Sequence, residues 1–190
     1  QFLGYKKRKT IQIFRNKDQQ LHHIPISELE QKLRFTFTDH LHFASYQDFL
    51  LSRKRAQRVL RSDTYKKMNE WVLSMHGKGL QRLPDLDNIY LCHVSKQIGY
   101  GVFAAKRIPA LSFVGEYTGQ VQRRPLWKKE LGDYVFAYHA AQKSTRLIVN
   151  GEGQGNFTRF INHSENANLL SRWVVDKGLG RIIFFTKRVI

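Results

Sequence analysis

The second half of the chain is a series of short runs rich in Val, Ile, Phe and Tyr, and this pattern limits the fold more than any other feature. From about residue 85, glycine, proline and polar turns separate the runs. Their spacing predicts a compact, mostly β domain of several small sheets and argues against a doubly wound sheet with long crossover helices. The runs are IYLCHV, GYGVFAA, LSFVGEYTG, DYVFAYHA, RLIV, SRWVV and RIIFFT.

The front of the chain has a different pattern. Residues 1–25 are basic and are expected to form a partly extended lead-in. Two helix starts follow, because Ser27 with Glu30 and Ser45 with Asp48 have the spacing of capping boxes.

A further helix is expected over the stretch SDTYKKMNEWVLSMHG, where apolar residues recur at helical spacing. We therefore divide the chain into a basic, mainly helical region over residues 1–85 and a mostly β domain over residues 86–190, an α+β protein overall. The inward face of this helix is expected to hold Met68, Val72 and Met75, with Gly77 beyond its end.

The chain is strongly basic along its whole length. It has 32 Lys and Arg against 15 Asp and Glu in 190 residues, a formal net charge of +17. Residues 1–85 carry 17 basic and 8 acidic residues, and residues 86–190 carry 15 and 7. Such a surface favours polyanions or proteins that sit on polyanions, although a basic surface that serves only solubility stays an alternative.

The single cysteine, Cys92, excludes disulfides and cysteine-rich zinc clusters within the chain and fits a reducing, intracellular compartment. It is expected to be a small buried apolar residue. The sequence has no run of 18 apolar residues, so no membrane span is predicted. The eight histidines are scattered, and only His40 and His42 have the His-x-His spacing, with no acidic partner to complete a site, so a metal site is not predicted.

The stretch NFTRFINHSENANL, from Asn156 to Leu169, has no helical or strand period and is crowded with polar side chains. Buried without partners, these groups would cost free energy, so the stretch is either exposed or folded around something polar. The G-x-G of IGYGVFAAKRIP allows close approach of a ligand to the backbone but is equally typical of a turn between strands.

Five segments together resemble the SET domain of protein lysine methyltransferases: IGYGVFAAKRIP, FVGEYTGQV, DYVFAYH, GNFTRFINHS and RIIFFTKRVI, in this order. The resemblance covers about residues 88–190. It implies a SET fold with a knot-like C-terminal crossing of the chain. In its basic front half and its scarcity of cysteine, the chain is most similar to short bacterial SET proteins of the chlamydial type.

The resemblance also implies a site. The family binds S-adenosylmethionine in a pocket and admits the target lysine from the opposite face. Phe136 is expected to pack beneath the channel, and Glu116 and Tyr117 to be strand residues that pack the fold more than catalytic ones. The cofactor-binding residues it implies are Gly99, Tyr100, Gly101, Tyr134, Arg159, Asn162 and His163, with Tyr134 also as the catalytic channel tyrosine.

The sequence departs from the family pattern at several places. After RFINHS the family usually has Cys-x-Pro-Asn, where this chain has residues 165–168, ENAN, and a usual Asp-Ala is replaced by Asn150 and Gly151. The last family motif, G-E-x-L-x-x-D-Y, carries the principal catalytic tyrosine and is expected beyond Ile190. We expect the natural chain to continue; an inactive form is the alternative.

Two functions follow from the sequence. The first is a methyltransferase that uses S-adenosylmethionine and acts on a basic protein, such as a histone or histone-like protein associated with DNA. The second is a basic chromatin or nucleic-acid adaptor with an incomplete site. The resemblance to bacterial proteins suggests a secreted effector in a host nucleus, or a protein of the bacterial cytoplasm or nucleoid. The front helices could also mediate homo-oligomers.

Overall fold

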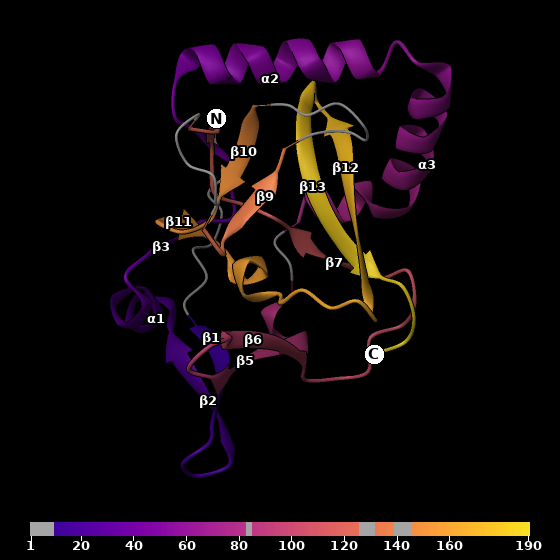
Figure 1. Cartoon of the computed structure of the whole chain (residues 1–190). Helices are drawn as coiled ribbons and strands as arrows, with labels where there is room; N and C mark the ends of the chain where they lie inside the picture. Colours follow the sequence, from indigo (N-terminus) through magenta and orange to yellow (C-terminus); the bar gives the residue numbers. More distant parts are fainter. Residues whose placement is uncertain (1–9, 83–84, 126–131, 139–145) are drawn as a thin grey trace.

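The structure is a computed structural model that describes residues 10–82, 85–125, 132–138 and 146–190, and it has four small sheets and three α-helices in this described part (Figure 1). The helices are α1 (Ile26–Leu33), α2 (Tyr46–Val59) and α3 (Asp63–Leu80), with 3₁₀ turns η1 (Leu86–Asn88) and η2 (Phe157–Phe160). The strands are β1 (Thr10–Arg15), β2 (Gln20–Pro25), β3 (Thr36–Phe37), β4 (His42–Phe43), β5 (Ile89–Ser95), β6 (Gly99–Ala104), β7 (Phe113–Glu116), β8 (Gln120–Arg123), β9 (Val135–Ala137), β10 (Leu147–Asn150), β11 (Gln154–Gly155), β12 (Leu169–Asp176) and β13 (Leu179–Thr186).

The first sheet joins the start of the chain to its middle, in the order β2-β1-β5-β6. β1 pairs antiparallel with β2 and parallel with β5, where Ile13 lies opposite Leu91. The segment expected as an extended lead-in is therefore, from Thr10 onward, a hairpin. It forms strands because Ile11 and Ile13 alternate with polar residues and bury their side chains in the core.

The other sheets have the orders β4-β8-β10-β9, β11-β3 and β12-β13-β7. Each of the seven β runs expected from the sequence overlaps one of these strands, so the prediction of a mostly β fold with small sheets is confirmed. β3 and β4, from the front half, pair with β11 and β8, so both halves of the chain share sheets. The knot-like crossing stays a prediction.

Of the two expected serine caps, only the one at α2 forms. At α2, Ser45 Oγ accepts from the backbone N–H of Asp48 at 3.1 Å, as predicted. At α1 the prediction was wrong: the N-cap is Pro25, without a side-chain hydrogen bond. Glu30 instead accepts from the backbone N–H of Phe37 through Oε1 at 2.7 Å, because the chain turns back into β3 after the helix.

α3 is longer than expected and is rotated relative to the predicted face. It continues to Leu80, so Gly77 lies inside it. Val72 is buried as predicted and Met68 is partly buried, but Met75 is 42% exposed. The buried positions next to Val72 are Asn69 and His76, which lie three residues before and four residues after it.

Cys92 is half-buried, so the expectation of a buried apolar residue was wrong. On β5 the side chains of Ile89 and Leu91 enter the core, and strand alternation turns Cys92 the other way. Its thiol lies 3.5 Å from Oδ1 of Asn16 as a weak donor.

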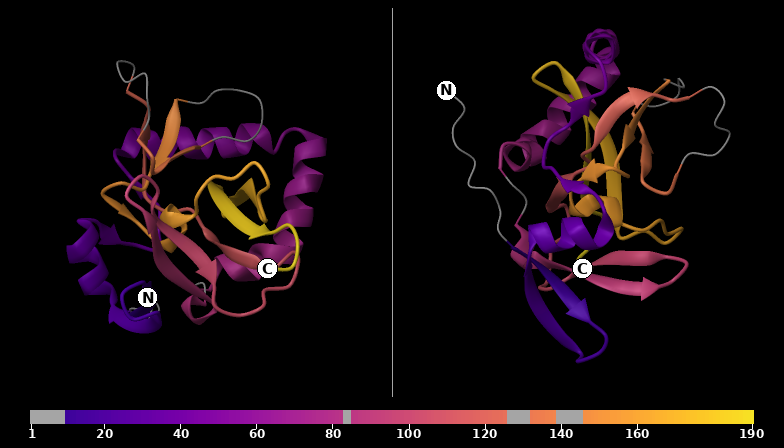
Figure 2. Two further views of the ribbon diagram at one scale, coloured as in Figure 1. Left: turned by 60° about the horizontal axis from the view of Figure 1, so that its bottom comes forward. Right: turned by 90° about the vertical axis from the view of Figure 1, so that its left-hand side faces the viewer.

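α1 lies beside the first sheet and contacts β2, whereas α2 lies at the other end of the molecule (Figure 1). α2 contacts β13 and β8, and α3 contacts β12 and β7. The two helices flank the β12-β13-β7 sheet, whereas the sheet of β1, β2, β5 and β6 lies at the opposite end from α2 (Figures 1 and 2). Among the described helices, none is long and apolar enough to cross a membrane.

Candidate functional site

The polar stretch that begins at Asn156 folds back on Glu116, the last residue of β7. Nδ2 of Asn156 donates to the carbonyl oxygen of Glu116 at 3.0 Å, and Oδ1 accepts from the backbone N–H of Thr158 at 3.0 Å. Thr158 Oγ1 also donates to Asn156 Oδ1 at 2.7 Å. Because Asn156 and the four residues of η2 are buried, these bonds satisfy groups that water cannot reach.

Arg159 is held in an aromatic cage rather than by a carboxylate. Its guanidinium carbon lies 3.9 Å from the ring centre of Tyr134, 4.3 Å from that of Phe35 and 5.0 Å from that of Phe160. Nη2 donates to the carbonyl oxygen of Glu152 at 3.0 Å. The side chain is buried, and desolvation lowers the pKa of the guanidinium.

The G-x-G segment, which forms the first three residues of β6 rather than a turn, meets Asn162 in the structure. Nδ2 of Asn162 donates to the carbonyl oxygen of Tyr100 at 3.4 Å. A Cβ at Gly101 would lie 3.1 Å from the same Nδ2, so the absence of a side chain lets the two segments approach. Gly99 has φ of +73°, a left-handed conformation that glycine adopts without strain.

A cavity of about 470 Å³ lies next to this junction, between η2 and the strands β9, β12 and β13. Tyr117, Phe136 and Phe184 supply aromatic surface to its wall, and Arg159 also borders it. A cavity that combines aromatic walls with many polar groups suits a small polar ligand or an inserted side chain. Its polar residues include Asn162, His163, Ser164 and Asn168.

Tyr117 borders the cavity, which the sequence did not predict. It was expected to pack the fold, and it is buried, but it also borders the cavity. Its hydroxyl donates to the carbonyl oxygen of Tyr134 at 2.7 Å, and burial raises the pKa of this phenol. The sequence feature that could have found it is strand alternation, because Glu116 and Tyr117 must point to opposite sides of β7 and its continuation.

Tyr134 itself is half-buried against Arg159 and Phe160, while its neighbours Asp133 and Val135 border the cavity. The role of this tyrosine in the channel stays a prediction. Phe136 is half-buried, packs against the rings of Tyr117 and Phe184 and borders the cavity, so its place beneath the channel stays a prediction.

Of the seven implied site residues, the structure thus brings Tyr100, Gly101 and Asn162 into contact. His163 lines the cavity from an exposed position, whereas Arg159 and Tyr134 are stacked together. Within the described ranges, no group of three or more His, Cys, Asp or Glu could hold a metal ion.

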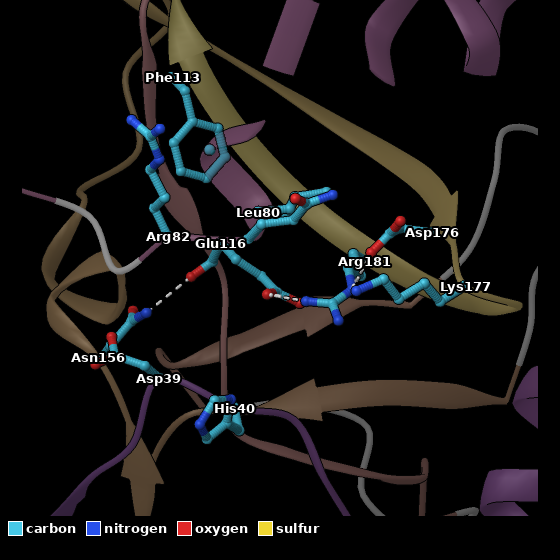
Figure 3. A pocket seen from close by; sticks show the side chains of 12 residues that line it. Asp39, His40, Leu80, Arg82, Phe113, Glu116, Asn156, Asp176, Lys177 and Arg181 are labelled. Carbon is cyan, nitrogen blue, oxygen red and sulfur yellow. Dashed lines mark hydrogen bonds and ion pairs between the residues drawn. The ribbon is translucent and has the colours of Figure 1, made fainter. Parts of the chain in front are cut away.

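A second, smaller hollow of about 200 Å³ lies on the other side of β7 and is shown in Figure 3. Glu116 points into it, 7% exposed, and its Oε2 accepts from Nη1 of Arg181 at 2.8 Å. Arg181 also pairs with Asp176, with 3.4 Å between Nε and Oδ2. Burial raises the pKa of Glu116 to about 7, although the cation of Arg181 acts in the opposite direction.

Comparisons with known proteins agree with this geometry. The SET domain model matches residues 99–190. Human histone-lysine N-methyltransferase SETD2 is 32% identical over 103 residues, which cover 51% of this chain and 4% of that protein. Histone-lysine N-methyltransferase ASHH3 of Arabidopsis thaliana is 32% identical over 103 residues, which cover 50% of this chain and 28% of that protein.

The fold comparison extends into the front half. The structure of the ATXR5 SET domain in complex with dimethylated histone H3 superposes with a TM-score of 0.60 and 20% identity, covering 86% of this chain and 79% of that one. At this identity the likeness concerns the fold alone. Residues 99–190 therefore form a SET domain related to those of histone-lysine methyltransferases, and the chain spans only a small part of the curated relatives it matches.

Proposed function

We propose that this protein transfers a methyl group from S-adenosylmethionine to the ε-amine of a lysine in a basic protein. The observation that carries the proposal is the contact between Asn162 and the backbone of Tyr100, beside a cavity with aromatic walls. Sequence segments that are 62 positions apart meet there, and both belong to the matched SET domain.

The residues at this junction suit the cofactor chemically. The exposed amide of Asn162 and the imidazole of His163 can hydrogen-bond the polar ends of S-adenosylmethionine, while Gly99, with open space where a side chain would stand, leaves the backbone accessible to it. The cofactor supplies a methyl group that its sulfonium sulfur already activates.

The chain then has to provide a neutral amine in line with that methyl. Deprotonating a free lysine at pH 7 costs about 4.6 kcal/mol, because its pKa is near 10.4. The aromatic wall of Tyr117, Phe136 and Phe184 would disfavour the charged amine by desolvation. The amine lone pair forms the new N–C bond as the C–S bond breaks, and the methylated ammonium afterwards releases its proton to solvent. Alignment contributes much of the remaining acceleration.

We propose a histone or histone-like protein on DNA as the substrate. The names of the relatives support the substrate class, and the charge of +17 supports the DNA, since this charge opposes direct approach of a free basic tail. An enzyme with this substrate would act on chromatin.

The test is methyl transfer from labelled S-adenosylmethionine by the full-length natural protein, with core histones and nucleosomes as acceptors. We expect label on histone lysines with wild type and none with Asn162→Ala. Transfer to no basic protein, together with retained binding to nucleosomes, would instead establish the second candidate, a chromatin adaptor, which the basic surface of α2 favours.

Two finer expectations stay proposals. The scarcity of cysteine and the basic front half support a bacterial effector that acts in a host nucleus, whereas the relatives named above are human and plant proteins. Homo-oligomers through the front helices would most plainly use α3, where Trp71 is 55% and Met75 42% exposed.

A further inference from the structure

The outer face of α2 is a stripe of basic side chains. Arg53, Lys54, Arg58 and Arg61 are all exposed, and they line an open groove of about 690 Å³ together with Leu50 and Gln57. No acidic residue lines this groove. We call these four basic residues the α2 stripe.

Helical geometry explains why the stripe is continuous. At 100° per residue, the positions of α2 that line the groove, from Leu50 to Arg58, fall within an arc of about 140°, and Arg61 continues the row just beyond the helix end at Val59. The opposite side of the helix carries the buried residues Asp48, Ser52 and Ala56. Over about 1.5 Å of rise per residue, the stripe from Arg53 to Arg61 is about 12 Å long.

The charges of the stripe are not neutralised by the protein. In the part of the chain that the structure describes, none of its four residues forms an ion pair with a carboxylate. The one acidic residue of α2, Asp48, is occupied by Ser45 and by Arg123, whose Nε lies 3.0 Å from Oδ1. Four neighbouring cations without counter-charges repel one another, and a bound polyanion would relieve that repulsion.

We propose that the α2 stripe binds the phosphate backbone of double-stranded DNA. One strand of B-DNA advances about 3.4 Å along the duplex axis per phosphate, so a stripe of about 12 Å matches the axial span of a few phosphates. Three of the four residues are arginines, whose planar guanidinium groups bind phosphate oxygens in pairs. The contact reads no base sequence, because only backbone charges meet it.

Other occupants fit the stripe less well. A helix that lies on a membrane inserts an apolar face, but the apolar side of α2 is already packed on the domain through Ala56, Leu51 and Val59. A second copy of this chain would bring the same positive charge to the same face. An acidic protein offers carboxylates, but not at the regular spacing of a phosphate backbone.

DNA binding by the stripe can be measured independently of methyl transfer. Its biological role rests on the proposed function, because DNA binding would hold the SET domain beside histones. The test is fluorescence anisotropy of a labelled duplex of about 20 base pairs, titrated between about 50 and 200 mM salt. The variant Arg53→Gln/Arg58→Gln/Arg61→Gln is compared with wild type.

The matched control removes the same charge elsewhere. Lys96, Lys106 and Arg107 are exposed at or beyond the ends of β5 and β6, at the opposite end of the molecule from α2 (Figure 1). The triple glutamine variant at these positions has the same net charge as the stripe variant. Both are also assayed for methyl transfer to free histones and to nucleosomes.

We expect the stripe variant to bind DNA at least about tenfold more weakly than wild type. The slope of log K against log salt should become shallower by about 2.7, because three phosphate contacts are lost. The control variant should lose less than about threefold in DNA affinity. Equal losses in both variants would overturn the proposal, as would binding of the stripe to phosphatidylserine vesicles or polyglutamate with DNA left unbound. Failure of methyl transfer on every substrate would remove the proposed function and leave the DNA result standing.

Discussion

The side-chain amide of Asn162 donates a hydrogen bond to the backbone carbonyl of Tyr100 at 3.4 Å. The bond ties the segment after η2 to β6, and Gly101 next to it leaves space for the amide. Because both partners are on the surface, the bond adds little to the stability of the fold. Its importance, on the proposed function, is that it fixes the position of two segments that the cofactor must contact together.

Asn162→Ala is therefore expected to abolish measurable binding of S-adenosylmethionine while changing the free energy of unfolding by less than about 1 kcal/mol. His163→Ala should act in the same direction. Isothermal titration gives the affinity and urea unfolding gives the stability. Asn166→Ala is the matched control, since Asn166 faces Arg188 instead of the junction. Wild-type affinity in both Asn162→Ala and His163→Ala would remove these residues from the cofactor site.

The positions of seven strands along the chain could be predicted from the sequence because each run is rich in β-forming residues and is bounded by turn residues. The cap at Ser45 was also predictable, since it depends on a residue only three positions away. The cap at Ser27 was not, because Glu30 is drawn to the backbone of Phe37 by a turn that local spacing does not encode.

The site was predictable where it rests on motifs and not where it rests on packing. The resemblance brought Asn162 to the G-x-G segment, but it gave no indication that Arg159 would stack on Tyr134 and Phe35. Nor did it place Tyr117 at the cavity, because strand alternation indicates that Glu116 and Tyr117 face opposite ways but not that a cavity lies on the side of Tyr117.

Glu116→Gln should change how stability depends on pH. The pKa of Glu116 is raised by burial from 4.5 to about 7, so the folded state holds an extra proton between these values. The stability of wild type then falls as pH rises through this window, by up to about 3 kcal/mol for this group. Glutamine does not titrate, so the free energy of unfolding of the variant should rise relative to that of wild type between pH 4.5 and pH 7. Urea unfolding at several pH values measures the difference, and a constant difference would contradict the burial argument.

Gly180→Ala should destabilise the protein by about 3 kcal/mol. A Cβ at this position would overlap the indole ring of Trp173, which is only 9% exposed and packs against the rings of Tyr65 and Tyr138. Gly153→Ala is the control, because a Cβ there would meet no atom within 4 Å, and we expect a change within about 0.5 kcal/mol. Thermal unfolding of both variants checks this, and equal melting temperatures would mean that the indole can move aside.

Asn69 closes the free edge of a sheet with a side chain. β12 is the outer strand of the order β12-β13-β7, so its far side has backbone groups without a strand partner. From α3, Asn69 Nδ2 donates to the carbonyl oxygen of Val175 at 3.1 Å, and Oδ1 accepts from the Val175 N–H at 2.7 Å. The amide thus imitates one residue of a neighbouring strand, in a place that is buried.

Asn69→Leu keeps the size of the side chain and removes both bonds. We expect it to cost about 2–4 kcal/mol, because two buried backbone groups of Val175 lose their partners and water cannot replace them. Glu70→Ala, at an exposed position of the same helix, should change stability by less than about 0.5 kcal/mol. Urea unfolding separates the two, and hydrogen exchange at the Val175 amide gives the direct readout: fast exchange in Asn69→Leu with protection kept at the other β12 amides. If that amide stayed protected in the variant, the edge would be closed by the packing of α3 rather than by the hydrogen bonds of Asn69.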